Sequence, residues 1–291
     1  MSILVNKDTN VLISGITGKE GTYHTEKMLA FGTKIVAGVT PGKGGIKHNG
    51  IPVYNTVKDA MSNHKIDACS IFVPAKFAFN AAKEAIENKI KFVVVITEGI
   101  CPHDSLKIIS LARKKGTVIL GPNTPGLVIP EECKIGVLAT DYIRKGNIGV
   151  VSRSGTLTVE ICYYLMQDGF GQSAVIGLGG DPVVGSSFKD IYKLFEEDAN
   201  TNGVVVVGEI GGTMEEELAE YIKSSKNKKP TVAFIAGQNA PQGKRLGHAG
   251  AIIEGGMGTA SSKIKALSDT GVKIAKVPWE IGKLMKDFLN K

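Results

Sequence analysis

Short apolar runs alternate with stretches of helical periodicity along the whole sequence. In the first 122 residues, β-branched and other apolar residues predict strands at 11–15, 34–39, 68–73, 92–97 and 117–121. Helices are expected between them, near 21–31, 56–63, 76–89 and 104–115. The strands are apolar throughout, which is typical of parallel strands buried on both faces. This part of the chain therefore predicts a doubly wound α/β domain.

Turn-forming residues interrupt this pattern at 121–126, and a second series of the same kind follows. We expect its strands near 147–152, 173–178, 203–208, 231–236 and 272–277. Its helices are expected near 156–168, 187–198, 214–226, 260–270 and 279–290. The simplest interpretation is two α/β domains that meet near residue 123, which suits a chain of 291 residues.

Composition and charge exclude several classes of protein. An apolar fraction of 43% and a charged fraction of 22% are typical of a globular protein. The net charge is +7, but no long basic run accounts for it, and the single Trp argues against stacked-base recognition of nucleic acid. We therefore attribute the charge mainly to solvated surface, with a smaller contribution from binding of anionic small molecules.

From the cysteines and the chain start we expect a cytoplasmic protein of bacterial or archaeal type, or one that has already been processed. Four isolated cysteines form no CxxC pair, which is typical of reduced thiols. The first residues contain neither a long apolar core nor an Arg-rich presequence, and no apolar stretch reaches transmembrane length. We expect no membrane and no nucleic acid among the partners.

The first predicted strand runs into a glycine turn that suits a phosphate group. Gly15, Gly18 and Gly21 give the spacing GxxGxxG before a helix, whose free N–H groups can bind an anion. A tight turn without a ligand is an equally good interpretation of the spacing alone. After the second strand, where an NAD site would place an acid, the chain has Lys43. This lysine favours a phosphorylated ribose, as in NADP or coenzyme A, although it can also be a solvated turn residue.

A histidine in the second half is the strongest candidate for chemistry. His248 lies in a segment, residues 247–258, in which five of twelve residues are glycine. Glycine lets the backbone approach a ligand closely, and imidazole is suited to nucleophilic or proton-transfer work near neutral pH. Lys244 and Arg245 add positive charge just upstream. A structural histidine is the alternative, but the setting favours a phosphorylated or general-base residue.

Two further features follow predicted strands of the second domain. Ser154, Gly155 and Thr156 open a helix and offer hydroxyls and N–H donors to an anion, although an ordinary helix cap explains one hydroxyl. Glu209 follows the strand at 203–208, where its carboxylate can accept from Nδ1–H of His248 and leave Nε2 free to attack phosphorus. No Walker A pattern and no convincing Mg²⁺-ligand spacing are present, so a nucleotide would be held by another polypeptide.

With these residues in place, the chain closely resembles the family of succinyl-CoA synthetase α subunits, also called succinate–CoA ligases. The resemblance runs nearly end to end. It implies a Rossmann-like CoA-binding domain at residues 1–122, followed by a flavodoxin-like doubly wound ligase domain at 123–291 that carries the phosphohistidine. Six motifs carry it in order: Thr40-Pro-Gly-Lys-Gly-Gly45, Thr97-Glu-Gly-Ile100, Gly121-Pro-Asn123, Ser152-Arg-Ser-Gly-Thr-Leu-Thr158, Gly179-Gly-Asp-Pro182 and Gly247-His-Ala-Gly-Ala-Ile-Ile253.

The resemblance also implies a reaction and a partner. ATP or GTP, held with Mg²⁺ on an ATP-grasp β subunit, would phosphorylate His248, with Glu209 orienting the ring. Succinate would take the phosphoryl group as succinyl phosphate, and the CoA thiol would displace phosphate. The assembly would be a heterodimer or a dimer of heterodimers. Ser154, Gly155 and Thr156 would bind the phosphate, and the residues implied for CoA are Thr17, Gly18, Lys19, Glu20, Lys43, Ile96, Thr97 and Glu98.

One position departs from the family pattern. Val159 stands where the motif usually has a tyrosine at the carboxylate-substrate site, and Tyr163 falls one helical turn further on the same face. A ligase for a related acid such as malate is therefore an alternative. Two alternatives from other classes are a nucleotide-sensing or CoA-binding regulatory module and an NADP-dependent oxidoreductase. The regulatory module gives His248 no role, and the oxidoreductase lacks a site for hydride transfer.

Overall fold

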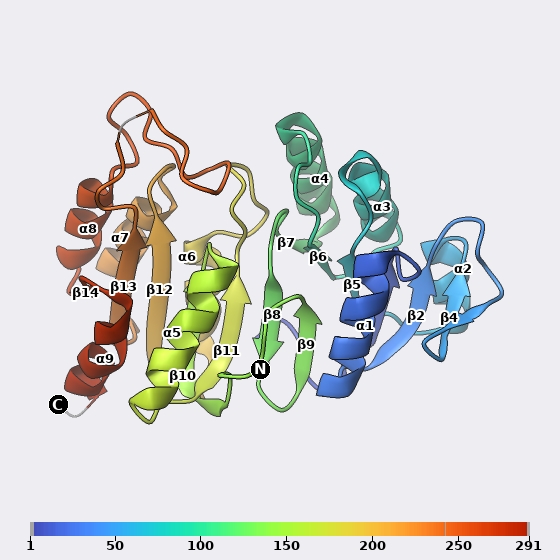
Figure 1. Cartoon of the computed structure of the whole chain (residues 1–291), viewed down its shortest axis with the longest axis horizontal. Helices are drawn as coiled ribbons and strands as arrows, with labels where there is room; N and C mark the ends of the chain where they lie inside the picture. Colours follow the sequence, from blue (N-terminus) through green and yellow to red (C-terminus); the bar gives the residue numbers. More distant parts are fainter. Residues whose placement is uncertain (1–2, 242, 290–291) are drawn as a thin grey trace. The chain divides into compact units, whose positions relative to one another are not determined.

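The apolar runs of the first half form a parallel sheet in the computed structural model, which describes residues 3–241 and 243–289 (Figure 1). Hydrogen bonding gives the order β3-β4-β2-β1-β5-β6-β7, in which β3 pairs antiparallel with β4 at one edge and the other pairs are parallel. The parallel strands, numbered along the chain, lie in the order 3-2-1-4-5-6 of the Rossmann fold, as predicted. The strands are β1 (Val11–Ser14), β2 (Ile35–Val39), β3 (Lys47–His48), β4 (Ile51–Tyr54), β5 (Ala68–Ile71), β6 (Phe92–Val95) and β7 (Val118–Leu120).

Helices connect these strands where the periodicity predicts them. The helix at 102–115 shows which residues begin and end a helix in this part of the chain. Pro102 opens it, Arg113–Lys115 place three cations in its last turn, and Gly116 ends it in the left-handed conformation. α3 and α4 pack side by side. The helices are α1 (Lys19–Phe31), α2 (Val57–Asn63), α3 (Ala75–Glu87) and α4 (Pro102–Lys115).

A hairpin that the apolar pattern does not predict follows the first sheet. Strands β8 (Gly126–Ile129) and β9 (Cys133–Gly136) pair antiparallel. The Thr33 hydroxyl, at the end of α1, donates to the Lys134 carbonyl at 2.7 Å and accepts from the Lys134 N–H at 3.0 Å. Both residues are buried, so this pair of hydrogen bonds holds the hairpin against α1.

By contacts the chain divides into two units. The first unit comprises residues 4–137 and 183–185, and the second unit comprises Ile3 and residues 138–182, 186–241 and 243–289. The predicted domains at 1–122 and 123–291 stay a prediction, because compactness alone does not define which segments fold independently.

The strands of the second unit form a parallel sheet in the order β14-β13-β12-β10-β11. Numbered along the chain, this is the order 2-1-3-4-5 of flavodoxin-like folds, which confirms the second fold prediction. The central strand is buried along its whole length, so its continuous valines face helices on both sides. The strands are β10 (Lys145–Ser152), β11 (Gln172–Gly177), β12 (Gly203–Glu209), β13 (Thr231–Ala236) and β14 (Lys273–Ala275).

The helices of this unit follow the same logic of caps and apolar faces. At the start of α6, Ser187 and Asp190 exchange side-chain and backbone hydrogen bonds in a capping box. The helix expected at 279–290 begins as a 3₁₀ turn (Pro278–Glu280) and continues as α9, while residue 290 lies outside the described residues. The helices are α5 (Gly155–Gln167), α6 (Phe188–Glu197), α7 (Met214–Ser224), α8 (Ala260–Ser268) and α9 (Ile281–Leu289).

The parallel register brings three loops to one edge of the second sheet. Ser152 of β10 pairs with Val207 of β12, and Glu209 at the end of β12 pairs with Ala236 of β13. The loop after β13 spans residues 237–259 and contains His248. Over residues 3–241 and 243–289, no helix combines the length and apolar character that a bilayer crossing requires.

Candidate active site

The structure brings the two predicted catalytic residues into direct contact. Nδ1 of His248 lies 2.8 Å from Oε2 and 3.0 Å from Oε1 of Glu209. A carboxylate can only accept, so Nδ1 carries the proton and donates it. Nε2 is then the nitrogen with the free lone pair in the neutral ring. Glu209 is buried, while the His248 side chain keeps 30% of its surface exposed, so its ring remains open to a reactant.

A buried arginine completes this pair. Nε of Arg153, which follows β10, lies 3.2 Å from Oε1 of Glu209, and its side chain is only 2% exposed. Its terminal nitrogens lie 3.4 Å from the Gly211 carbonyl and 3.5 Å from the Asp181 carbonyl. The guanidinium therefore shares the Glu209 carboxylate with His248 and contacts the backbone of two neighbouring loops.

Glycines bring the backbone close to the histidine. A Cβ on Gly180 would lie 2.4 Å from Cγ of His248, so the imidazole packs directly against this backbone. The Gly250 N–H donates to the Gly180 carbonyl at 2.9 Å, which holds the histidine loop in place. Gly211 takes a φ of +91° and would place a Cβ 2.0 Å from the Gly250 carbonyl. No other residue fits these positions without moving the histidine loop.

The start of α5 lies next to this cluster because it directly follows Arg153. Ser154 is the N-cap residue, and its hydroxyl accepts from the Leu157 N–H at 3.3 Å. Gly155 and Thr156 form the first turn, where backbone N–H groups have no partner within the helix. The helix dipole favours an anion at this end. Their role in phosphate binding stays a prediction.

The hydrogen bond from His248 to Glu209 raises the pKa of the imidazole above its ordinary value of 6.5. Burial lowers this pKa, and so does the positive charge of Arg153, whereas the charges of Glu209 and Asp181 raise it. The paired carboxylate outweighs desolvation, so the protonated ring is favoured relative to a free histidine.

In the first unit, the predicted glycine turn joins β1 to α1. Gly15 has a φ of +84°, and a Cβ on Gly21 would lie 2.2 Å from the Gly15 carbonyl. Gly18 is the N-cap residue and supplies no side-chain cap, so the helix start is not occupied by its own chain. Thr17 donates to Thr40 at 3.2 Å, which joins this turn to the one after β2. Lys19 and Glu20 are exposed in the first turn of α1.

Lys43 lies on an ordered turn after β2. The Asn55 side-chain oxygen accepts from the N–H groups of Gly42 and Gly44, each at 2.9 Å, and the Lys43 N–H donates to the Thr40 carbonyl at 3.0 Å. The lysine side chain itself is exposed. The turn is therefore fixed while its cation faces solvent.

The third predicted CoA segment follows β6 at the same edge of the sheet, since β1, β2 and β6 are parallel members of it. Ile96 and Thr97 are half-buried and Glu98 is exposed. The Thr97 hydroxyl donates to the Val73 carbonyl at 2.7 Å, which joins this segment to the end of β5. Parallel α/β sheets bind ligands at the carboxyl ends of their strands, and all predicted CoA residues lie there.

Val159 is half-buried in the second turn of α5, and Tyr163 is partly exposed one turn further on. The Tyr163 ring packs edge-on against Tyr142 and Tyr164, with centroid distances of 5.0 and 5.3 Å. Tyr163 is thus part of an aromatic row, and its role in substrate binding stays a prediction.

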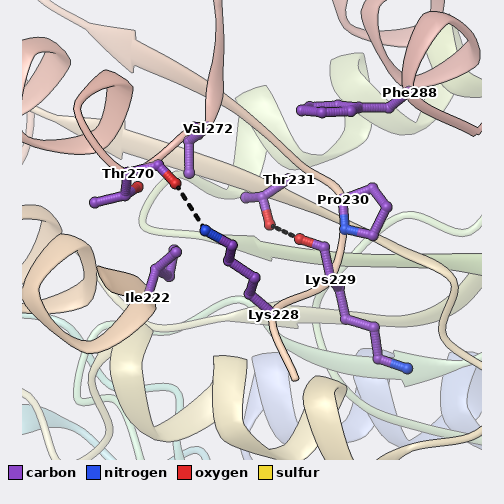
Figure 2. Close-up of a pocket in the computed structure, with 9 residues that line it drawn as sticks. Ile222, Lys228, Lys229, Pro230, Thr231, Thr270, Val272 and Phe288 are labelled. Carbon is purple, nitrogen blue, oxygen red and sulfur yellow. Dashed lines mark hydrogen bonds between the residues drawn. The ribbon is translucent and has the colours of Figure 1, made fainter. Parts of the chain in front are cut away.

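A separate pocket of about 230 Å³ lies at the opposite edge of the second sheet (Figure 2). Thr231 at the start of β13 and Val272 just before β14 line it, with Ile222 and Phe288. Lys228 donates to the Thr270 carbonyl at 3.4 Å within it. The pocket is distant from the chemistry, because Glu209 lies at the carboxyl end of the parallel strand β12. The described residues contain no group of three or more His, Cys, Asp or Glu placed to hold a metal ion.

Comparison with known proteins places the chain in a family. A CoA-binding domain model matches residues 6–99, and a CoA-ligase model matches residues 151–273. The succinate–CoA ligase [ADP-forming] subunit alpha 2 of Archaeoglobus fulgidus is 50% identical over 99% of this chain and 100% of its own length. The chain belongs to the family of succinate–CoA ligase α subunits. The succinate–CoA ligase [ADP-forming] α subunit of Staphylococcus epidermidis is also 50% identical, over 100% of this chain and 96% of its own length.

A solved structure shows the same fold in a longer chain. An ATP citrate lyase of Methanosaeta concilii in complex with (3S)-citryl-CoA superposes with a TM-score of 0.90 at 25% identity. The match covers 99% of this α subunit and 51% of the lyase chain, so the α subunit spans about half the length of that chain.

These findings confirm the predicted family, the α/β fold and the CoA-binding character of residues 6–99. The α subunit is part of an acid–CoA ligase, which favours neither the regulatory module nor the oxidoreductase. The individual site residues stay predictions.

Sequence reasoning missed two members of the cluster around His248. Arg153 and Gly180 both lie in the motifs that carry the family resemblance, at 152–158 and 179–182. A motif shows that a residue belongs to the pattern but not what it touches. The buried contact of Arg153 with Glu209, and of Gly180 with the imidazole, required the structure.

Replacing Glu209→Gln should lower the pKa of His248, because the amide removes the charge and weakens the hydrogen bond that raise it. The stability that depends on this raised pKa is fully present below about pH 6.5, the unfolded value, and is lost as pH rises through the folded pKa. In Glu209→Gln this pH-dependent part of the free energy of unfolding should shrink. NMR titration of the ring gives the pKa directly, with the exposed Glu220→Gln as control. An unchanged His248 pKa in Glu209→Gln would contradict the assignment.

Proposed function

We propose that this α subunit, together with an ATP-grasp β subunit, forms succinyl-CoA reversibly from succinate and CoA through a phosphohistidine and succinyl phosphate. The observation that carries the proposal is the His248–Glu209 pair, which occupies Nδ1 and leaves Nε2 open. Family membership supports the overall reaction, since the relatives are named succinate–CoA ligases.

In the first step, neutral Nε2 attacks the terminal phosphorus of the nucleoside triphosphate. The Nε2–P bond forms, the bond from phosphorus to the bridging oxygen breaks, and the diphosphate leaves. The ring then carries positive charge, which the Glu209 carboxylate stabilises through Nδ1–H. The N-terminus of α5, with Ser154, Gly155 and Thr156, lies beside the pair and suits the new phosphoryl group.

The following steps return the histidine to its starting state. A succinate carboxylate oxygen attacks phosphorus, so the P–N bond breaks and an acyl phosphate forms. The CoA sulfur then attacks the acyl carbon, the bond from this carbon to the phosphate oxygen breaks, and phosphate leaves with the thiol proton. Glu209 keeps the imidazole in one orientation throughout.

CoA is assigned to the first unit. The glycine turn at 15–21, the turn bearing Lys43 and the segment 96–98 all follow parallel strands at one sheet edge. The open start of α1 suits a diphosphate, and the exposed ammonium of Lys43 suits a phosphorylated ribose. The match of a CoA-binding family model to residues 6–99 supports this assignment.

The nucleotide and Mg²⁺ are assigned to the β partner. The relatives named above are α subunits of ADP-forming ligases, which supports ATP rather than GTP as the nucleotide. The ATP citrate lyase chain is about twice the length covered here, which fits an α-like half joined to a further portion. We infer a heterodimer or a dimer of heterodimers in the present case.

His248→Asn should abolish the phosphoenzyme and the overall reaction while the fold and CoA binding are retained. Asn keeps a polar side chain but offers no nucleophilic nitrogen. The α subunit and its β partner are incubated with ATP labelled at the terminal phosphate, and acid-labile, base-stable label on the α subunit is measured. Label that persists on His248→Asn would place the nucleophile elsewhere.

Lys43→Glu should weaken CoA binding by about 10- to 100-fold, since hydrogen bonds to charged groups contribute about 1.5–3 kcal/mol. Phosphorylation of His248 by ATP should be unaffected. Titration calorimetry compares this variant with Lys34→Glu, an equal charge change just before β2, at the other end of the same strand. CoA affinity that is equal in both variants would make Lys43 a solvated turn residue only.

Val159→Tyr should sharpen selectivity for the acid substrate. An apolar side chain separates short acids by only about 1–3 kcal/mol per methylene, whereas a hydroxyl that bonds the substrate rejects analogues more strongly. The measurement is kcat/KM for succinate, malate and glutarate in wild type, Val159→Tyr and Tyr163→Phe. A preference for malate in the wild type would favour the alternative of a malate ligase, and identical profiles would remove both positions from the pocket.

A further inference from the structure

A lysine with no exposed surface lies behind the active site. Lys263 of α8 is 0% exposed, and its ammonium group has three acceptors. It donates to Glu215 at 2.5 Å, to Glu216 at 3.0 Å and to the Gly212 carbonyl at 2.9 Å. Three N–H donors thus meet three oxygens, so the buried charge is fully satisfied within the chain.

Glu215 connects this lysine to the catalytic pair. It lies in the first turn of α7 and is fully buried. Its Oε2 binds Lys263, while its Oε1 accepts from the backbone N–H of Glu209 at 3.1 Å. Glu215 therefore holds the main chain of the residue whose side chain holds His248.

Lys263 also joins the two segments that supply the catalytic pair. Its acceptors all lie in the turn and the first helical residues that follow β12, the strand that ends with Glu209. Lys263 itself lies in α8, directly after the loop 237–259 that contains His248. The beginning of that loop is held by the pairing of β13 with β12, and its end is held by this lysine.

The stability of the fold does not explain why a buried ion-pair cluster is present here. Burial raises the pKa of Glu215, and the charges of Lys263 and Arg153 only oppose that effect. Apolar side chains of similar size usually serve a core as well as a buried ion pair does. A requirement for geometry at Glu209 is a better explanation.

We propose that Glu215 and Lys263 are positioning residues that fix the main chain of Glu209 and thereby aim its carboxylate at Nδ1 of His248. The proposal rests on the proposed function only for its kinetic consequence. Its geometric consequence, the orientation of Glu209 toward His248, is measured through the His248 pKa on the isolated α subunit. Glu209, Arg153 and Asp181 are the charged groups that act on the imidazole, and only the first is held by Glu215.

The test compares two double variants of the full chain. Lys263→Met with Glu215→Leu replaces the ion pair by apolar side chains and leaves the Glu209 N–H without its acceptor. Lys263→Met with Glu215→Gln also removes the charges but keeps an amide oxygen for that N–H. Both double variants lose the contacts of Lys263 with Gly212 and Glu216. Any difference between them in the His248 pKa or in the phosphorylation rate therefore reports whether the Glu209 N–H keeps its acceptor. Lys265→Met, an exposed lysine of the same helix, is the control.

The His248 pKa, measured by NMR, should fall in the Leu variant and stay near the wild-type value in the Gln variant. Phosphorylation of His248 should slow by about 10- to 100-fold in the Leu variant, the size of effect that a displacement of about 1 Å produces. Circular dichroism confirms that each variant is folded. If the Leu variant does not fold, Glu215→Asp is used instead, because it keeps the charge but withdraws the carboxylate from the N–H.

Equal pKa values and rates in the two double variants would overturn the proposal, whether both are wild-type or both are reduced. Failure of the proposed function is distinguishable, because the wild type would then carry no phosphoryl label. The His248 pKa would still fall in the Leu variant if the positioning role is correct.

Discussion

A buried carboxylate persists in a folded protein only where charged or hydrogen-bonding partners replace its water, and the site of this α subunit is arranged around one such group. Glu209 contacts His248 through both carboxylate oxygens, Arg153 through Oε1, and Glu215 through its main-chain N–H. Each partner comes from a different segment. The segments that follow β10, β12 and β13, together with α7, must therefore fold correctly before the imidazole has its orientation.

The backbone has to come close for these contacts to form, and this explains the glycines. Gly180 touches the imidazole, and Gly211 lies against the Gly250 carbonyl. A methyl group at either position would push the histidine loop away from Glu209. Glycine is therefore required by the distance between two loops as well as by positive φ at Gly211.

The sequence predicted much of this because parallel strands follow simple rules. Continuous apolar runs predicted the central strands, and their carboxyl ends singled out Glu209 and the start of α5 as candidates, whereas the glycine-rich segment at 247–258 singled out His248. The hairpin β8–β9 was not predicted, because its fully buried strands lie among Gly and Pro residues that indicate turns. The burial of Arg153 and Lys263 was not predicted for a different reason. A charged residue is normally expected at the surface, and only its partners in space explain its burial.

The charges around His248 also fit the group that it is proposed to carry. A phosphoryl group brings about 1.5 to 2 negative charges near neutral pH, and the Glu209 carboxylate would repel it. Arg153 lies against that carboxylate and offsets its charge, while the N-terminus of α5 adds a positive dipole end directly after Arg153. Glu209 can therefore orient the ring through Nδ1 while the repulsion between its charge and an anion bound at Nε2 is offset. A buried arginine that contacts the carboxylate and directly precedes the helix start in the sequence reconciles these two requirements.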